Sequence, residues 1–286
     1  MFEQIIGNAK IKEYLSTSIS TNSVSHSYMF VGKSGVGKKI IAREFAENIM
    51  NANSEKKVVN LDSTTDYMQI DPEGNTIKIA QIRELQTKIF EKPTSFSKKI
   101  YLINDADLMT EESQNCLLKT LEEPPEYAII ILIVSNESKM LETIKSRCVI
   151  VKFNNLSDNE ISDYLKMTNN TKLNDIPEIT KLLEGSLEKI EEIEYKKEEY
   201  ETLKKIAENI KTGNILNVIS NADLLYTSKD DIIELLEYMN IIFFNARKLY
   251  AIHIIENTKR KLLANNNYEM CIDNMLMQLC NSMHNN

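Results

Sequence analysis

The sequence is poor in cysteine, and its four cysteines (Cys116, Cys148, Cys271 and Cys280) are far apart. They form neither a disulfide framework nor a closely spaced pair of the kind that binds zinc. No apolar run approaches the ~20 residues that a membrane span needs. The first residues have neither the basic region nor the apolar region of a secretory signal. We therefore expect a cytoplasmic, reduced protein without structural zinc.

Positive charge is also scarce, since 34 basic residues face 42 acidic ones and the net charge is -8. A protein that binds DNA by itself needs a basic surface to displace counterions, so this balance argues against an independent DNA-binding module. Hydrophobic residues make up 42% of the 286 residues, as in an ordinary globular protein. Arginine is rare, and the chain has five: Arg43, Arg83, Arg147, Arg247 and Arg260.

Residues 1–155 alternate short apolar segments with amphipathic ones, which predicts a three-layer α/β domain with a mostly parallel sheet. The helix 111–122 has Thr110 as its expected N-cap and Pro124-Pro125 as its stop. The other predicted helices are 38–50 and 79–91. The predicted strands are 28–31, 58–61, 67–70, 100–103, 129–134 and 149–153.

Strand signals end at Leu156, where Ser157 and Glu160 have the spacing of a capping box that opens a helix. The apolar spacing beyond it predicts helices only, at about 195–212, 214–226, 229–256 and 258–283. We expect three domains: an α/β domain over 1–155, a small helical domain over 156–194 and a helical domain over 195–286.

Three of the seven glycines fall between residues 32 and 37, within a segment that fits the phosphate-loop pattern G-x-x-x-x-G-K. It follows a predicted strand and opens a predicted helix, the context in which backbone N–H groups and a lysine bind phosphate. A glycine-rich turn that merely joins a strand to a helix is the simpler alternative. The candidate nucleotide-binding residues are Gly32, Ser34, Gly35, Val36, Gly37, Lys38 and Lys39.

At three positions the residue differs from the one that an active ATPase needs. Lys39 stands where a Ser or Thr hydroxyl would hold Mg²⁺, and an ammonium has no lone pair for a cation. Asn104 replaces the metal-linked Asp, and Asp105 replaces the water-activating Glu with one methylene less. A register shift by one residue would put Asp105 in the metal position, but Ala106 would then be the base. Asp107 is expected to be an acid at a helix N-terminus. We expect no ATP hydrolysis, and weak or absent ATP or ADP binding in which Lys39 could still contact a phosphate.

The phosphate loop, Leu117-Leu-Lys-Thr-Leu-Glu-Glu-Pro-Pro125 and Ser146-Arg147-Cys148 together resemble the bacterial AAA+ clamp-loader subunits of DNA polymerase III. The opening Phe2-Glu-Gln-Ile-Ile-Gly7 and the segment Thr258–Asn267 are similar to that family as well. Within it, the loop ending Gly37-Lys38-Lys39 differs from the gamma and tau ATPases, which keep Ser or Thr after the lysine. This difference favours a clamp-loader subunit that does not hydrolyse ATP. The alternative is an active ATPase of the gamma or tau type.

The resemblance implies a RecA-like α/β domain, a helical lid and a helical collar. It also implies a pentamer with gamma or tau and delta subunits, which places a ring-shaped sliding clamp on primed DNA. In this family the arginine of the Ser-Arg-Cys motif reaches the ATP of a neighbouring subunit, so the candidate catalytic residue is Arg147, acting in trans. The simpler alternative is an arginine that caps a helix over 138–145.

Further positions are compared with the family pattern. The ATPases carry a lid arginine at the third position after a Gly-Ser pair, whereas Gly185-Ser186 is followed there by Glu188, whose charge would repel a triphosphate. Related subunits often bind zinc after the phosphate-loop helix, but residues 51–100 contain no cysteine, so we predict no zinc. Ser135 is a weak candidate for a polar sensor, and Cys148 is expected to be a small buried residue.

Overall fold

The computed structural model describes residues 1–2, 5–52, 54, 57–58, 60–168, 179–213 and 215–283. The chain divides into two compact units. The first consists of Met1–Ile161 with Gly185–Glu188, and the second of Ser162–Glu184 with Lys189–Asn286. The three-domain division stays a prediction.

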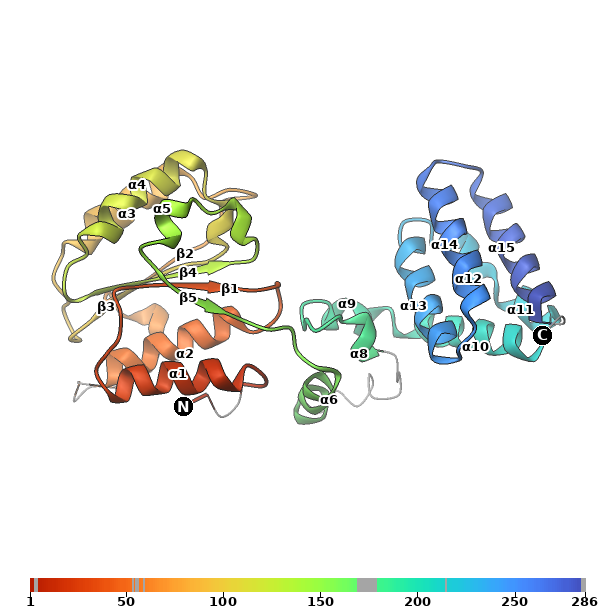
Figure 1. Ribbon diagram of the computed structural model, residues 1–286, viewed down its shortest axis with the longest axis horizontal. Coiled ribbons are helices and arrows are strands. Elements are labelled where there is room, and N and C mark those ends of the chain that lie inside the picture. Colours follow the sequence, from red (N-terminus) through yellow and green to blue (C-terminus); the bar gives the residue numbers. More distant parts are fainter. Residues whose placement is uncertain are drawn as a thin grey trace. The chain divides into compact units, whose positions relative to one another are not determined.

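A parallel five-stranded sheet forms the centre of the first unit (Figure 1). Its order is β2-β3-β4-β1-β5, and every paired strand is parallel to its neighbour. The central strands β3, β4 and β1 are buried at every residue because helices cover both faces of the sheet. The strands are β1 (Ser27–Val31), β2 (Tyr67–Ile70), β3 (Lys99–Ile103), β4 (Ala128–Val134) and β5 (Val149–Lys152).

Alternate residues of β4 divide the core into two halves. Ile129, Ile131 and Ile133 pack in the half that includes residues of α1 (Ala9–Ser20) and α2 (Lys38–Asn51). Ile130, Leu132 and Val134 pack in the half built with α3 (Ile79–Ile89), α4 (Glu111–Glu122) and α5 (Glu142–Lys145). Figure 1 shows these two sets of helices on opposite faces of the sheet. The predicted three-layer α/β fold is confirmed.

Two local predictions for the first unit are wrong. The described residues of the predicted strand 58–61, which are 58, 60 and 61, do not form a strand: the side chain of Asn60 accepts the N–H of Asp62, which starts the 3-10 helix η1 (Leu61–Ser63). The helix predicted over 138–145 is broken, since η3 (Glu137–Lys139) ends before Met140 and Leu141, both extended, and α5 follows. A further 3-10 helix, η2 (Ala106–Leu108), lies between β3 and α4.

Asp66, directly before β2, fixes the loop that leads into β3. Its fully buried carboxylate accepts the backbone N–H groups of Thr94, Ser95 and Phe96 at 2.8, 2.7 and 2.9 Å. Burial raises the pKa of this carboxyl, but the backbone hydrogen bonds outweigh burial, so its pKa lies below its ordinary value.

The second unit is helical. The helix predicted over 229–256 ends at Asn245 instead, and Arg247 adopts a left-handed conformation (φ 56°) before the next helix, which runs to Leu263. The helix predicted over 214–226 is likewise divided at Ala222. α6 (Asp158–Met167) starts in the first unit. The others are α8 (Ile179–Leu182), α9 (Ile190–Tyr195), α10 (Lys197–Thr212), α11 (Ile215–Asn221), α12 (Asp223–Thr227), α13 (Ile232–Asn245), α14 (Leu249–Leu263) and α15 (Tyr268–Met283).

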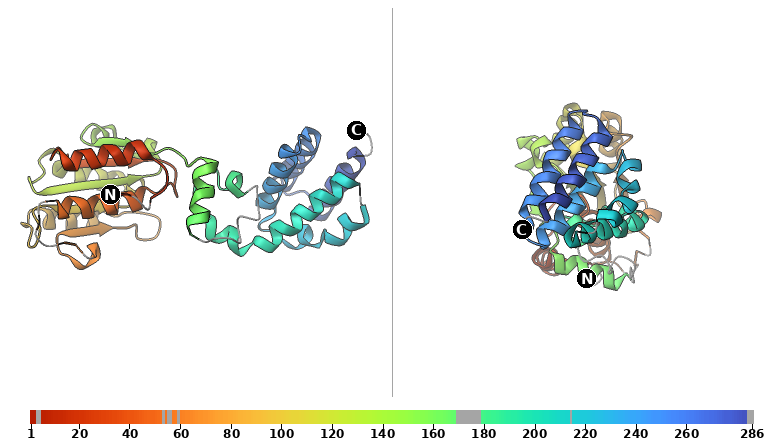
Figure 2. Two further views of the ribbon diagram at one scale, coloured as in Figure 1. Left: turned by 90° about the horizontal axis from the view of Figure 1, so that it is seen from below. Right: turned by 90° about the vertical axis from the view of Figure 1, so that its right-hand side faces the viewer.

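The longer helices α10, α13, α14 and α15 pack together in this unit (Figure 2). Their core includes the edge-to-face pair Tyr200 and Tyr238, whose ring centroids are 4.8 Å apart. Among the helices of the described residues, none has the length and apolar character required to cross a membrane.

Candidate nucleotide site and trans arginine

The phosphate loop connects β1 to α2 at the carboxyl edge of the sheet. Gly37 caps α2 in a left-handed conformation (φ 92°), which a residue with a Cβ rarely adopts. Gly32 lies against the chain that leaves β5, since a Cβ added there would be 2.8 Å from the Cβ of Phe153. Val36 is buried in the core and Ser34 is half-buried. The strand–loop–helix context that the sequence predicts is therefore present.

The side chain of Lys38 is 5% exposed and is engaged by its own loop. Its Nζ donates to the carbonyl oxygens of Gly32 (2.6 Å) and Lys33 (2.8 Å) and lies 3.3 Å from Oγ of Ser135. An ammonium has three hydrogens, so these three acceptors use its full capacity. Burial lowers the pKa of Lys38, while Asp105, Asp107 and Glu188 act in the opposite direction. A phosphate would have to displace contacts that already exist.

Lys39 is paired with an aspartate that follows β2. Its Nζ lies 3.2 Å from Oδ1 of Asp71, and Nε2 of Gln69 donates to the other carboxylate oxygen at 2.6 Å. Burial raises the pKa of Asp71, but these hydrogen bonds outweigh it and the pKa is lowered. Nothing in the sequence pattern around Asp71 had indicated this pairing.

The residues after β3 reach the same edge of the sheet. Asn104 donates to Oδ2 of Asp105 at 3.0 Å, and burial together with the charge of Asp107 raises the pKa of Asp105. Asp107 lies in the first turn of η2, as predicted. Its carboxylate also accepts the N–H groups of Ser135 (2.9 Å) and Asn136 (3.2 Å), so it joins the ends of β3 and β4.

The segment 185–188 lies against the phosphate loop. The N–H of Leu187 donates to the carbonyl oxygen of Gly35 at 3.0 Å, and a Cβ at Gly35 would be 2.1 Å from Oγ of Ser186. Ser186 is 5% exposed and accepts the N–H of Glu188 at 3.1 Å. The negative charge of Glu188 is thus held near Lys38, where it acts on the pKa of that ammonium.

Arg147 lies in the turn between α5 and β5, and its side chain is 33% exposed. Nη1 donates to the carbonyl oxygen of Thr143 in α5 at 2.8 Å, and Nη2 donates to Oε1 of Glu122 at 2.6 Å. Sequence patterns alone indicate no role for Glu122. Cys148 is half-buried, and burial raises the pKa of its thiol to about 12, so it is not a nucleophile at neutral pH.

Arg147 and Lys38 belong to opposite edges of the sheet. The phosphate loop follows the carboxyl end of β1, whereas Arg147 precedes the amino end of β5, and the two strands are parallel neighbours with Tyr28 opposite Val149. The four residues of β5 alone span roughly 10 Å. The fold therefore separates this arginine from the chain's own phosphate loop.

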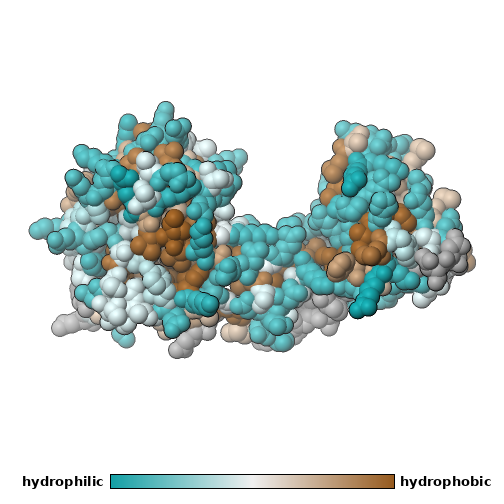
Figure 3. Space-filling model, viewed as in Figure 1, coloured by the Kyte–Doolittle hydropathy of each residue, from teal (hydrophilic) through white to brown (hydrophobic). Residues whose placement is uncertain are grey.

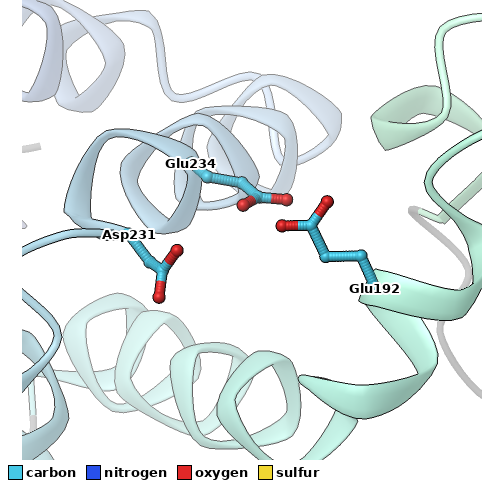
Figure 4. A group of neighbouring side chains, drawn as sticks. All are labelled: Glu192, Asp231 and Glu234. Carbon is cyan, nitrogen blue, oxygen red and sulfur yellow. The ribbon is translucent and has the colours of Figure 1, made fainter. Parts of the chain in front are cut away.

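A cluster of carboxylates in the second unit has the spacing of a cation site (Figure 4). Glu192, Asp231 and Glu234 surround the Nζ of Lys196 at 2.9, 2.9 and 3.1 Å. Burial lowers the pKa of Lys196, but these hydrogen bonds outweigh it and raise the pKa. The centre of the cluster is thus filled by the ammonium of Lys196, which joins α9 to the start of α13.

The strand order, the helices on both faces and the phosphate loop after the first strand define an α/β AAA+ fold. The family model described as DNA polymerase III, delta subunit, matches residues 7–157, more than half of the chain. The chain belongs to this family of bacterial clamp-loader subunits.

Several curated relatives are similar to the chain over its first part. The delta' subunit of DNA polymerase III from Bacillus subtilis is 34% identical over 166 residues, which cover 54% of this chain and 50% of that protein. The gamma subunit from Buchnera aphidicola subsp. Schizaphis graminum is 34% identical, with 58% and 48% covered. The chain thus spans about half the length of these relatives. A gamma subunit-related protein from Thermotoga maritima aligns with a TM-score of 0.48 and 21% identity, over 93% of this chain and 98% of that chain.

Proposed function

We propose that this chain is a delta-prime-like subunit of the DNA polymerase III clamp loader that does not hydrolyse ATP. It would act in the cytoplasm beside gamma or tau and delta subunits in a hetero-pentamer that places the sliding clamp on primed DNA. Its chemical contribution would be Arg147, supplied to the ATP of a neighbouring subunit, where a guanidinium stabilises the charge on the transferred phosphoryl group.

The separation of Arg147 from the chain's own phosphate loop carries this proposal. An arginine at the amino edge of the sheet cannot serve a nucleotide at the carboxyl edge of the same sheet, but it can serve a neighbour. The surface around it suits a protein contact. β5 is an edge strand with Ile150 38% exposed, and Figure 3 shows apolar surface on this unit.

The contacts that Lys38 and Lys39 make within the chain support the proposal that this subunit does not hydrolyse ATP. Lys38 is used by two carbonyl groups and Ser135, Lys39 is paired with Asp71, and Glu188 adds a negative charge near the loop. Both lysines thus already have partners, and Asn104 in place of a metal-linked acid brings no negative charge to a Mg²⁺ ion. We expect weak or absent binding of ATP and ADP, and no structural zinc.

A second candidate is an active gamma- or tau-like ATPase. Relatives with these names are as similar to the chain as the delta' relative, with 34% identity for the gamma subunit above. The two candidates differ in whether the isolated chain turns over ATP.

Reconstitution tests the proposed place in the loader. The purified chain is mixed with the gamma- or tau-type and delta-type subunits of the same organism, and the complex is sized by light scattering. Clamp loading on primed DNA is then measured with and without the chain. We expect a defined hetero-oligomer whose loading activity requires this chain. A chain that stays outside the complex, or a loader that works equally well without it, contradicts the proposal.

A further inference from the structure

The guanidinium of Arg147 is held in one orientation by three groups of its own unit. Nη2 donates to Glu122 at 2.6 Å, and Nη1 donates to the carbonyl oxygen of Thr143 at 2.8 Å and to Oγ of Ser146 at 3.3 Å. A guanidinium has five N–H groups. Within the described part of the chain, the N–H on Nε and the second N–H on Nη2 have no acceptor. Two donors therefore remain for a ligand from outside.

Glu122 occupies a position that helix stability alone disfavours. It is the last residue of α4, where the carbonyl groups give the helix a partial negative charge, and a second acid, Glu123, follows it as the C-cap. Among the described residues, the partner of its carboxylate is Arg147, to which it is joined across 25 positions of sequence. The carboxylate thus contributes an orienting contact to the arginine and no favourable term to its own helix.

We propose that Glu122 is a positioning residue for Arg147, an inference that rests on the proposed trans role of that arginine. A free arginine side chain has many rotamers, and ordering it when the neighbouring subunit docks would weaken its interaction with the phosphate. Glu122 and Thr143 order the guanidinium beforehand by holding its two Nη atoms. The N–H groups of Nε and Nη2 that remain are then presented to the phosphate oxygens of the neighbour's ATP.

The size of the effect follows from the exposure of the pair. The side chains of Arg147 and Glu122 are 33% and 47% exposed, and exposed ion pairs are weak because water and salt screen them. We therefore expect removal of the carboxylate to lower kcat of the receiving site by about two- to five-fold. KM for ATP should stay unchanged, because the neighbour's own phosphate loop binds the ground state.

The test uses the reconstituted loader with primed DNA and compares Glu122→Ala, Glu122→Gln, Arg147→Ala and the double variant. Glu123→Ala is the matched control, since Glu123 is adjacent, acidic and exposed. For each complex, kcat and KM of the site that receives Arg147 are measured from the fast phase of hydrolysis by rapid quench, and thermal unfolding of each free chain shows whether it is folded. We expect E122A to lower kcat and leave KM unchanged. E122Q keeps an acceptor oxygen and should lower kcat less. E123A should match the wild type, and E122A should have no further effect in the R147A background.

Three results would overturn the inference. An unchanged or raised kcat for E122A, with R147A strongly impaired, would show that Glu122 does not orient the arginine or that it competes with the phosphate. An equal loss for E122A in the presence and in the absence of Arg147 would show that Glu122 acts on something other than Arg147. A rate that R147A itself leaves unchanged would remove the proposed trans role and this inference together.

Discussion

Replacement of Arg147 by alanine should affect catalysis far more than folding. The side chain is 33% exposed, and its ion pair with Glu122 belongs to the exposed class, worth about 0–1 kcal/mol. The carbonyl oxygen of Thr143 can bond to water once the guanidinium is gone. The melting temperature of the chain should therefore fall by no more than about 4 °C, and ring assembly should persist.

The catalytic loss should be far larger. An arginine supplied in trans to a phosphate-loop NTPase raises kcat by about 10³–10⁵-fold. The one site that receives Arg147 should therefore become silent, while the other ATPase sites of the loader keep their rates. A rapid-quench measurement of DNA-stimulated hydrolysis should show that the fast phase loses the amplitude of a single site.

Two variants serve as controls for this experiment. Arg147→Lys keeps the charge without the planar fork of donors, and we expect it to restore little of the lost amplitude. Arg83→Ala removes an exposed arginine of α3 and should leave the amplitude intact. A full fast phase in the R147A loader would refute the trans role. A loss of amplitude together with a loss of ring assembly would assign Arg147 a structural role instead.

Three further predictions concern the phosphate loop and the acid stability of the first unit. Lys38→Ala should leave the DNA-stimulated ATPase of the loader nearly unchanged, while the loss of its buried hydrogen bonds lowers the unfolding free energy in urea by about 1–3 kcal/mol; a large loss of rate in the folded variant would contradict this. Glu188→Gln should increase the affinity of the isolated chain for ATP, measured by calorimetry, because it removes a negative charge near Lys38. The exposed control Glu191→Gln should not, and equal affinities in both variants would refute the reasoning. Asp66→Asn should lower the unfolding free energy by about 1–3 kcal/mol at pH 7, because three backbone N–H groups lose their charged acceptor.

The pH dependence of the last variant has a defined sign. The pKa of Asp66 is lower in the folded state than in the unfolded state. Its contribution to the free energy of unfolding is therefore present above the unfolded pKa of about 3.9 and is lost as the pH falls through the folded pKa. Urea unfolding curves of wild type and D66N should therefore differ most near neutrality and converge in acid. A difference that stays constant down to the lowest pH would contradict the assignment.

Local signals in the sequence predicted much of the fold. Thr110 caps α4 by accepting the N–H of Ser113, and Ser157 and Glu160 form the expected capping box before α6. The continuous apolar run of β4 identified a strand that is buried on both faces. These features depend on residues within a few positions of one another, so the sequence alone carries them.

The missed features lack such a local signal. The break between α13 and α14 places Arg247 in a left-handed conformation without a glycine or proline to mark it. The contact of Leu187 with Gly35 and the ion pair of Glu122 with Arg147 join residues that are far apart in sequence. The candidate site residues could thus be chosen from sequence motifs. The hydrogen-bond and ion-pair partners of Lys38, Lys39 and Arg147 could be identified only from the structure.

ATP turnover by the purified chain, measured with and without Mg²⁺, tests the central claim most directly. Our account predicts no turnover, and ATP binding that is weak and independent of the metal, because Lys38 is engaged by its own loop and Lys39 cannot ligate Mg²⁺. Mg²⁺-dependent turnover that is abolished by Lys38→Ala would contradict it and would identify the chain as an ATPase in its own right.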